Sequence, residues 1–239
     1  MESGENIVEI EKYIENTELL NKYEFHNYGH ALEILYSAFP QEWHEIQNCL
    51  INFELTLSDI QVAGGNESPI PKKFDQYLYP CGWREIRISG DLVITQYIRQ
   101  SSQRRKTKES DLSQEKKTIN GYIDGHNIDF VKNKVAFDLE WNSKDQTFDR
   151  DLMAMRTYFD CGIIEVGILV TRAEELNEIF DKVADENGNI LRRKYGASTT
   201  WMGKLTPRLD SRRNGGCPIL AVGIRKGCFT DYGRLTSDN

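Results

Sequence analysis

Three acidic residues lie close together in the middle of the chain, within the stretch NIDFVKNKVAFDLEWNSKD of residues 127–145. Asp129 ends one short apolar run, a turn of Lys and Asn follows, and Asp138 and Glu140 belong to the next run, VAFDLEW. In that run large apolar residues alternate with the acidic ones, which is the pattern of a β-strand whose residues i and i+2 share a face. We therefore expect two carboxylates side by side, opposite an apolar face.

Two adjacent carboxylates on a central strand repel each other and are costly to desolvate. An edge strand with a solvated face is the simplest interpretation of the pattern. The alternative is a divalent-metal site, in which the cation neutralises the pair and Asp129 supplies a third oxygen ligand. Such hard oxygen ligands suit Mg²⁺, which uses one or two carboxylates together with waters and substrate phosphate. This combination hydrolyses phosphodiesters.

Other catalytic patterns are absent from the sequence. It contains no GxxxxGK[ST], GxGxxG, GxSxG or HExxH motif, and no His follows position 126. His26 and His30 would be four residues apart on one expected helix, a spacing that can bind zinc, but no further ligand is near and a surface helix is favoured. The acidic residues are thus the main chemical signal.

Length and composition indicate a globular protein. The 239 residues include 39% apolar and 28% charged residues, and no linker rich in Gly, Pro or Ser divides them, so we expect a single domain over residues 1–239. The longest apolar stretch, near Ile163–Val170, is too short to span a bilayer. The acidic N-terminus does not resemble a signal peptide, and five scattered Cys residues form no CxxC pair. We expect no membrane partner and a reducing, cytoplasmic environment.

Charge is distributed unevenly along the chain. The net charge is −7, yet residues from Asn187 onward carry ten Lys or Arg and only three Asp. A basic end on an acidic body can present a positive face to an anion, although a solvated surface is an equal alternative.

The periodicities indicate an α/β protein with a mixed central β-sheet flanked by helices. We expect a helical part at 1–55, a core at 83–183 and an irregular region at 185–216. More specific expectations are helices at 5–23, 26–39, 41–53, 72–79, 146–160 and 173–183; strands within 83–98, 119–130, 134–141, 163–170 and 217–224; and loops at 61–71 and 99–117.

The order strand, Asp, turn, strand with Asp-x-Glu, helix, strand resembles the core of PD-(D/E)xK nucleases. It is closer to type II restriction endonucleases of the BglII/BstYI kind. IDFVKNKVAFDLEW resembles their active-site segment, AFPQEWHEIQNCL an N-terminal helix, GWRE the segment before a loop, and GGCPILAVGI the last core strand. The resemblance covers most of the chain from about residue 30 and implies a restriction-endonuclease-like fold.

If the active-site roles of that family are assigned to the matching positions, the resemblance implies that Asp129 and Asp138 are metal ligands and that Glu140 is a third catalytic residue. Glu140 departs from the pattern, because the superfamily has Lys there and this subfamily tends to have Gln. It would orient or deprotonate the attacking water or hold a second metal. The missing positive charge would then come from Lys132, Lys134 or Lys144, and Glu85 is a possible additional acidic residue.

The resemblance also implies a prokaryotic homodimer that uses Mg²⁺ to cut double-stranded DNA at a short palindrome, leaving 5′-phosphate ends. Bases would be read from the segment after the catalytic strand and from the basic region at 196–213. The candidate DNA-binding residues are Asn142, Ser143, Lys144, Asp145, Ser198, Thr199, Thr200, Lys204, Arg208, Arg212 and Arg213.

Several alternatives remain open from the sequence. VAFDLEW also resembles the first motif of DEDD-type 3′–5′ exonucleases, although the later HxxxD or YxxxD motif is missing, and another structure-specific DNA repair nuclease belongs to the same class. FDLEW has a faint similarity to family-18 chitinases, but the chain is short for their (β/α)₈ barrel. A protein that binds DNA without cutting it is the alternative from a different class.

Overall fold

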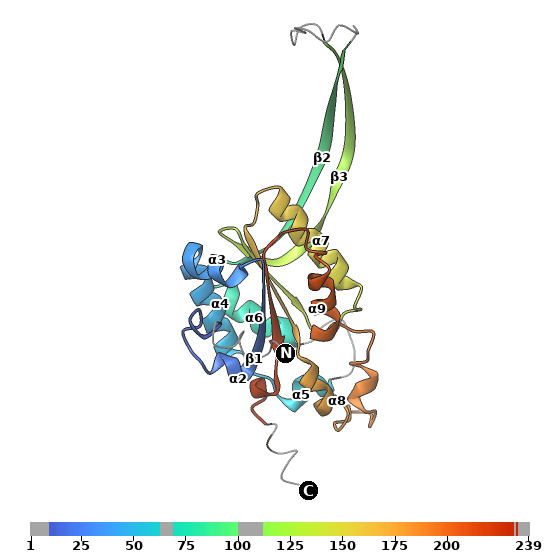
Figure 1. Cartoon of the computed structure of the whole chain (residues 1–239). Coiled ribbons are helices and arrows are strands. Elements are labelled where there is room, and N and C mark those ends of the chain that lie inside the picture. Colours follow the sequence, from blue (N-terminus) through green and yellow to red (C-terminus); the bar gives the residue numbers. More distant parts are fainter. Residues whose placement is uncertain (1–9, 63–68, 100–111, 232, 234–239) are drawn as a thin grey trace. The chain divides into compact units, whose positions relative to one another are not determined.

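The computed structural model describes residues 10–62, 69–99, 112–231 and 233. Its strands form one mixed sheet in the order β1-β6-β5-β4-β3-β2, and helices flank the sheet, which confirms the predicted α/β class (Figure 1). The strands are β1 (Tyr23–Tyr28), β2 (Arg84–Arg99), β3 (Leu112–Lys132), β4 (Val135–Glu140), β5 (Val166–Arg172) and β6 (Ile219–Ile224). The helices are α2 (Leu19–Lys22), α3 (Ala31–Ala38), α4 (Pro40–Asn52), α5 (Leu57–Gln61), α6 (Pro69–Leu78), α7 (Thr147–Asp160), α8 (Asn177–Phe180) and α9 (Met202–Asp210).

The chain divides into two compact units, of which the first comprises residues 1–86 and 128–239. In this unit β4, β5 and β6 are parallel neighbours, while β1 and the end of β3 pair antiparallel at either side. Every residue of β4, β5 and β6 is buried, as expected for strands covered on both faces. Helices α3, α4 and α6 lie on one side of the sheet and α7 and α9 on the other (Figure 1).

Aromatic contacts join the sheet to the helical layer of α4 and α6. The Phe74 ring lies 4.6 Å from that of Phe53 and 5.6 Å from that of Phe137, centroid to centroid. Phe137 also packs edge-on against Phe130 of the neighbouring strand. Since Phe137 immediately precedes Asp138, this packing fixes the strand that carries the candidate catalytic residues.

The second unit spans Arg87–Asn127 and contains the antiparallel ribbon of β2 and β3. Part of the predicted 99–117 loop is strand instead, because β3 begins at Leu112. Residues 100–111, among them the basic Arg104, Arg105, Lys106 and Lys108, lie outside the described residues. Asp91 stabilises the ribbon by accepting a 2.8 Å hydrogen bond from the Gly121 amide, at a bend where Gly121 has φ +63°.

The structure corrects the predicted N-terminal helices. Residues 23–28 form β1, which pairs antiparallel with β6 from Tyr23 opposite Ile224 to Tyr28 opposite Ile219. Gly29 and His30 both have positive φ, so the backbone turns sharply there and α3 starts only at Ala31. The apolar residues of 23–35 therefore belong to a strand and a helix, which the predicted 26–39 helix merged into one.

Two further predictions need correction in the C-terminal half. Residues 173–183 form a 3₁₀ turn, Glu174–Leu176, and the short helix α8 rather than one continuous helix. The region 185–216 contains the well-formed helix α9, whose buried Met202, Leu205 and Leu209 repeat at helical spacing. Pro207 lies inside this helix. A Pro in a helix interior normally argues against a helix, so this segment was predicted to be irregular. That residues 1–239 form a single endonuclease domain stays a prediction.

Candidate active site

Asp129 and Asp138 face each other across the β3–β4 hairpin. The register pairs Phe130 with Phe137, so Asp129 and Asp138 are the next opposed residues. The Asp129 amide lies 3.4 Å from Asp138 Oδ1, and the amide of Leu139 donates a 3.2 Å hydrogen bond to Asp129 Oδ2. The tight turn has positive φ at both Asn133 and Lys134, as a two-residue hairpin requires. The structure thus brings the first two predicted site residues together.

Asp138 and Glu140 are both buried, at 5% and 7% exposure, so the interpretation as a solvated edge strand is wrong. Burial raises the pKa of Asp138, and the neighbouring charges of Asp129, Asp151 and Glu140 raise it further. Burial also raises the pKa of Glu140, although hydrogen bonds with Ser143 and Asp151 oppose the effect. These carboxyls are therefore held in an environment that disfavours their simultaneous ionisation.

Asp151 is a fourth acidic residue of the site, one not predicted from the sequence. It lies on α7, is 2% exposed, and its carboxyl hydrogen bonds with that of Glu140. Burial raises its pKa to about 8, with the Glu140 charge acting in the same direction. The signal was available, because Phe148, Asp151 and Leu152 occupy i, i+3 and i+4 of the apolar stripe of α7, and a carboxylate on a core-facing stripe is costly unless paired.

Arg150 places a positive charge beside these carboxyls. Its Nη2 atom lies 3.7 Å from Glu140 Oε1 and 3.3 Å from Asp151 Oδ1, and its side chain is half exposed. The lysines considered for this role are engaged elsewhere or point outward. Lys132 Nζ contacts both Glu45 oxygens at 2.7 and 2.8 Å, and Lys134 Nζ contacts Glu165 at 2.9 Å, while the exposed Lys144 lies opposite Thr199. The other predicted acidic residue, Glu85, is exposed on β2.

The donor set suits a hard divalent cation. All four acidic residues offer carboxylate oxygens, and two of these atoms, Glu140 Oε2 and Asp151 Oδ2, are buried without a hydrogen-bond donor among the described residues. A cation at this place would offset both the burial of these negative charges and their mutual repulsion, the two causes of the raised pKa values. Within the described residues, however, no group of three or more His, Cys, Asp or Glu side chains is already arranged to hold a metal ion.

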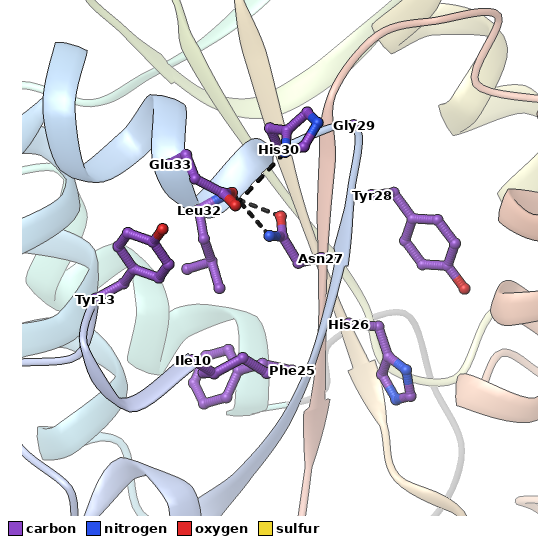
Figure 2. A pocket seen from close by; sticks show the side chains of 10 residues that line it. All are labelled: Ile10, Tyr13, Phe25, His26, Asn27, Tyr28, Gly29, His30, Leu32 and Glu33. Atoms are coloured by element: carbon purple, nitrogen blue, oxygen red, sulfur yellow. Dashed lines mark hydrogen bonds and ion pairs between the residues drawn. The ribbon is translucent and has the colours of Figure 1, made fainter. Parts of the chain in front are cut away.

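The histidine pair considered for zinc does not form a site. His26 lies on β1 and His30 precedes α3, so they do not share a helix face. Both histidines line a hollow of about 420 Å³. Figure 2 shows that Asn27 and His30 point toward Glu33, whereas His26 and Tyr28 project from the opposite side of the strand. Glu33 accepts a 2.8 Å hydrogen bond from Asn27 Nδ2 and lies 3.5 Å from His30 Nδ1. Asn27 Oδ1 also accepts a 3.0 Å hydrogen bond from the Leu32 amide, so this network ties β1 to the first turn of α3.

The structure brings two predicted DNA-reading segments side by side, although more than fifty residues separate them in the sequence. Lys144 pairs with Thr199 in an antiparallel bridge. The Asp145 amide donates to Ser198 O at 3.0 Å, and the Thr200 amide donates to Ser143 O at 2.9 Å. Lys144 and Ser198 are exposed, whereas Thr199 and Thr200 are buried; Asn142, Ser143 and Asp145 are intermediate.

Three of the predicted basic residues contact acidic residues at the start of α7 or just before it. Arg208 makes a two-point contact with Asp149, 3.1 Å at each oxygen, and Arg213 contacts the same carboxylate. Burial alone would raise the pKa of Asp149, but these hydrogen bonds outweigh it and lower the pKa. Lys204 lies 4.0 Å from Asp145, and Arg212 is exposed with φ +58°.

Comparison with known families decides between the remaining interpretations. The profile described as Restriction endonuclease BglII/BglIII matches residues 23–224. The chain belongs to this restriction endonuclease family. The match runs from the first residue of β1 to the last of β6 and includes all four acidic residues, Arg150 and both candidate reading segments.

Membership of the BglII/BglIII family makes the protein a restriction nuclease that acts on DNA, and it sets aside the chitinase and exonuclease interpretations. A comparison with curated proteins finds no match. Among the helices that the structure describes, none is both long and apolar enough to cross a membrane.

Proposed function

We propose that this restriction endonuclease is a homodimer that hydrolyses double-stranded DNA at a short palindrome in the presence of Mg²⁺, leaving 5′-phosphate ends. The observation that carries the proposal is the convergence of Asp129, Asp138, Glu140 and Asp151 beside Arg150, in a chain of this family. Carboxyls whose pKa values are raised by burial and by neighbouring negative charges are expensive for stability, and such an arrangement is typical of functional sites.

Asp129 and Asp138 would hold the metal, because they come from adjacent strands and face each other directly. When bound, Mg²⁺ supplies positive charge against the scissile phosphate and makes a nearby water more acidic. Without the cation, burial and the repulsion from Asp129 favour proton uptake at Asp138, so the state competent for metal binding is the one that has lost that proton.

Glu140 and Asp151 would orient the attacking water. Asp151, whose pKa is raised to about 8, holds a proton that it shares with Glu140. Glu140 then has an oxygen that can accept a hydrogen bond from water and orient it toward the phosphorus. This role explains how an acid can stand where the superfamily has Lys: the water-orienting group and the positive charge come from different side chains.

Arg150 would supply that positive charge. Its guanidinium lies against Glu140 and Asp151, yet half of the side chain remains accessible to a substrate. A cation placed here stabilises the negative charge that builds up on the phosphate in the transition state. Because Arg150 comes from α7 and not from β4, the active-site strand pattern alone does not reveal it.

DNA would lie against the exposed residues of the paired reading segments and the basic side chains on and just after α9. Lys144 and Ser198 present donors suited to base edges, and Asn142 and Asp145 lie beside them. Lys204, Arg208, Arg212 and Arg213 suit phosphate contacts, which position the duplex without reading it. DNA phosphates would either replace Asp149 as the partner of Arg208 and Arg213 or bind guanidinium N–H groups of these residues that do not contact Asp149.

The direct test is digestion of phage DNA and of closed circular duplex with Mg²⁺, followed by sequencing of the fragment ends. We expect ends that converge on one short palindromic sequence, 5′-phosphates at those ends, linearisation of the circle, and no cutting in EDTA. Retained DNA binding with no Mg²⁺-dependent cutting would instead identify a non-cleaving binding protein. Degradation only from free ends would contradict the endonuclease assignment.

A further inference from the structure

Arg172 is an unusual buried charge outside the acidic cluster. It is the last residue of β5, is 1% exposed, and forms no ion pair with a carboxylate of the described residues. Burial lowers its pKa to about 9. A buried guanidinium without a counter-ion is costly, and an apolar side chain of similar volume would often be more stable. Its presence therefore calls for a role beyond stability.

The donors of Arg172 bind two segments that are distant in sequence. Nε donates to Trp141 O at 2.7 Å and to Thr200 O at 3.1 Å. Nη2 donates to Thr200 O at 2.7 Å and to Thr199 Oγ1 at 2.6 Å. The planar guanidinium thus connects Trp141, which directly follows Glu140, with residues 199–200, which pair with residues 143–145.

The neighbouring residue extends this connection to the catalytic strand. Thr171 Oγ1 donates a 2.7 Å hydrogen bond to Glu140 O, so Thr171 and Arg172 together hold two consecutive carbonyls at the end of β4. Beyond them, the Thr200 amide holds Ser143 O and the Asp145 amide holds Ser198 O. The path from Glu140 to both reading segments is therefore continuous through hydrogen bonds that centre on Arg172.

An aromatic cage fixes the plane of the guanidinium. Its central carbon lies 5.0 Å from the ring centroid of Tyr195, 5.2 Å from Phe180 and 5.9 Å from Trp141. Phe180 and Tyr195 are themselves stacked, with centroids 4.3 Å apart. Arg is suited to this cage because its charge is delocalised, weakly hydrated and carries donors in a rigid fork, whereas a lysine ammonium would bind at a single point.

The segments that Arg172 holds are otherwise poorly satisfied. Trp141 Nε1, Asn142 Oδ1 and Thr200 Oγ1 are buried with no hydrogen-bond partner among the described residues. A buried polar atom without a partner is not compensated for the water it has lost, so it disfavours the local conformation. Residues 141–145 and 198–200 therefore depend on a tether to keep their shape.

We infer that Arg172 is a positioning residue for sequence recognition: it locks the paired segments 142–145 and 198–200 in register with the catalytic strand, so that base reading and cleavage are coupled. The inference rests on the proposed endonuclease function for its effect on specificity, while the tether itself does not depend on cutting. Thr199 and Thr200 act as anchors in this arrangement, and the exposed Lys144 and Ser198 make the contacts with DNA.

The test compares wild-type protein with Arg172→Lys, which retains the charge but not the fork. Sequencing the fragment ends from Mg²⁺ digests identifies every cleaved site directly. We expect Arg172→Lys to cut the main site at a rate within a few-fold of wild type, while the share of ends at sites with one altered base pair rises about tenfold, the scale of one base contact. Hydrogen exchange should become about tenfold faster in peptides covering 142–145 and 198–200 but not in β5 or β6.

Arg225→Lys is the matched control. Arg225 follows the last strand, contacts Glu175 Oε2 through Nε and Nη2 at 3.3 and 3.2 Å, and touches neither reading segment. The Arg225→Lys protein should lose some thermal stability but should cut the same set of sites as wild type. If the Arg172→Lys protein does not fold, Thr199→Val replaces it, because it removes one acceptor of Nη2 and leaves the cage intact.

The outcomes separate the two proposals. A folded Arg172→Lys protein with wild-type exchange and wild-type sites overturns the positioning role, as does equal broadening by Arg225→Lys. If wild-type protein cuts no DNA, the proposed function fails, yet the exchange comparison still decides whether Arg172 holds the two segments.

Discussion

The raised pKa of Asp151 leads to a prediction about stability in the absence of metal. The ordinary aspartate pKa is 3.8, and burial beside Glu140 raises the folded-state value to about 8. A group with a raised folded-state pKa stabilises the fold through its bound proton; this contribution is complete below pH 3.8 and is lost as the pH rises toward 8. Metal-free protein should therefore become less stable between about pH 5 and pH 7.

The magnitude follows from proton linkage. One proton retained by the folded state but not by the unfolded state changes the free energy of unfolding by about 1.4 kcal/mol per pH unit. Across two pH units this amounts to about 3 kcal/mol for Asp151 alone, a substantial part of a typical total of roughly 5–15 kcal/mol. The pKa values of Asp138 and Glu140 are raised as well, so they act in the same direction.

Urea unfolding at pH 5, 6 and 7 in EDTA measures the effect, with Asp151→Asn as the comparison. The variant removes one titrating group but retains its shape, so other groups, including the four His residues, cancel in the difference. We expect the variant to gain about 3 kcal/mol relative to wild type between pH 5 and pH 7. A difference that does not change with pH would refute the assigned shared proton. Added Mg²⁺ should stabilise wild type more at pH 7 than at pH 5, because protons compete for the same oxygens.

Three further substitutions probe the neighbouring charges. Arg150→Gln should lower kcat about 100-fold with little change in KM, whereas Arg150→Lys should retain part of the rate, as single-turnover cleavage can measure. Lys132→Met should leave kcat unchanged but reduce the free energy of unfolding, measured by urea titration, by roughly 3 kcal/mol. The reason is that Glu45, whose side chain is 13% exposed, loses its positively charged partner. Arg208→Ala should weaken DNA binding equally for all sequences and reduce the salt dependence of log K by about one unit, measured by fluorescence anisotropy at several salt concentrations.

The contacts formed within a hairpin could be predicted from the sequence. Asp129 and Asp138 are separated by one tight turn, so alternation and turn chemistry are enough to oppose them. The buried strands β5 and β6 also follow from their apolar runs, and α7 from its helical periodicity. In each case the interactions that determine the local structure join residues no more than about ten positions apart in the sequence.

Contacts between distant elements could not be predicted in the same way. Asp151 reaches Glu140 only because α7 packs on β4, and Arg172 reaches Thr199 only once the region after residue 184 folds back. The error at β1 has a similar cause: residues 23–28 become a strand by pairing with β6, almost two hundred residues later. Local propensity is a weak guide where such a tertiary partner decides the conformation.

The most direct measurement of the central claim is single-turnover cleavage by Asp138→Ala, with DNA binding measured on the same preparation. Asp160→Ala is the matched control, because Asp160 is an exposed acid at the end of α7, away from the cluster. The account predicts that Asp138→Ala folds, binds DNA with an affinity within a few-fold of wild type and cuts at least about 1,000-fold more slowly, while Asp160→Ala cuts normally. Cleavage by Asp138→Ala at the wild-type rate would contradict it.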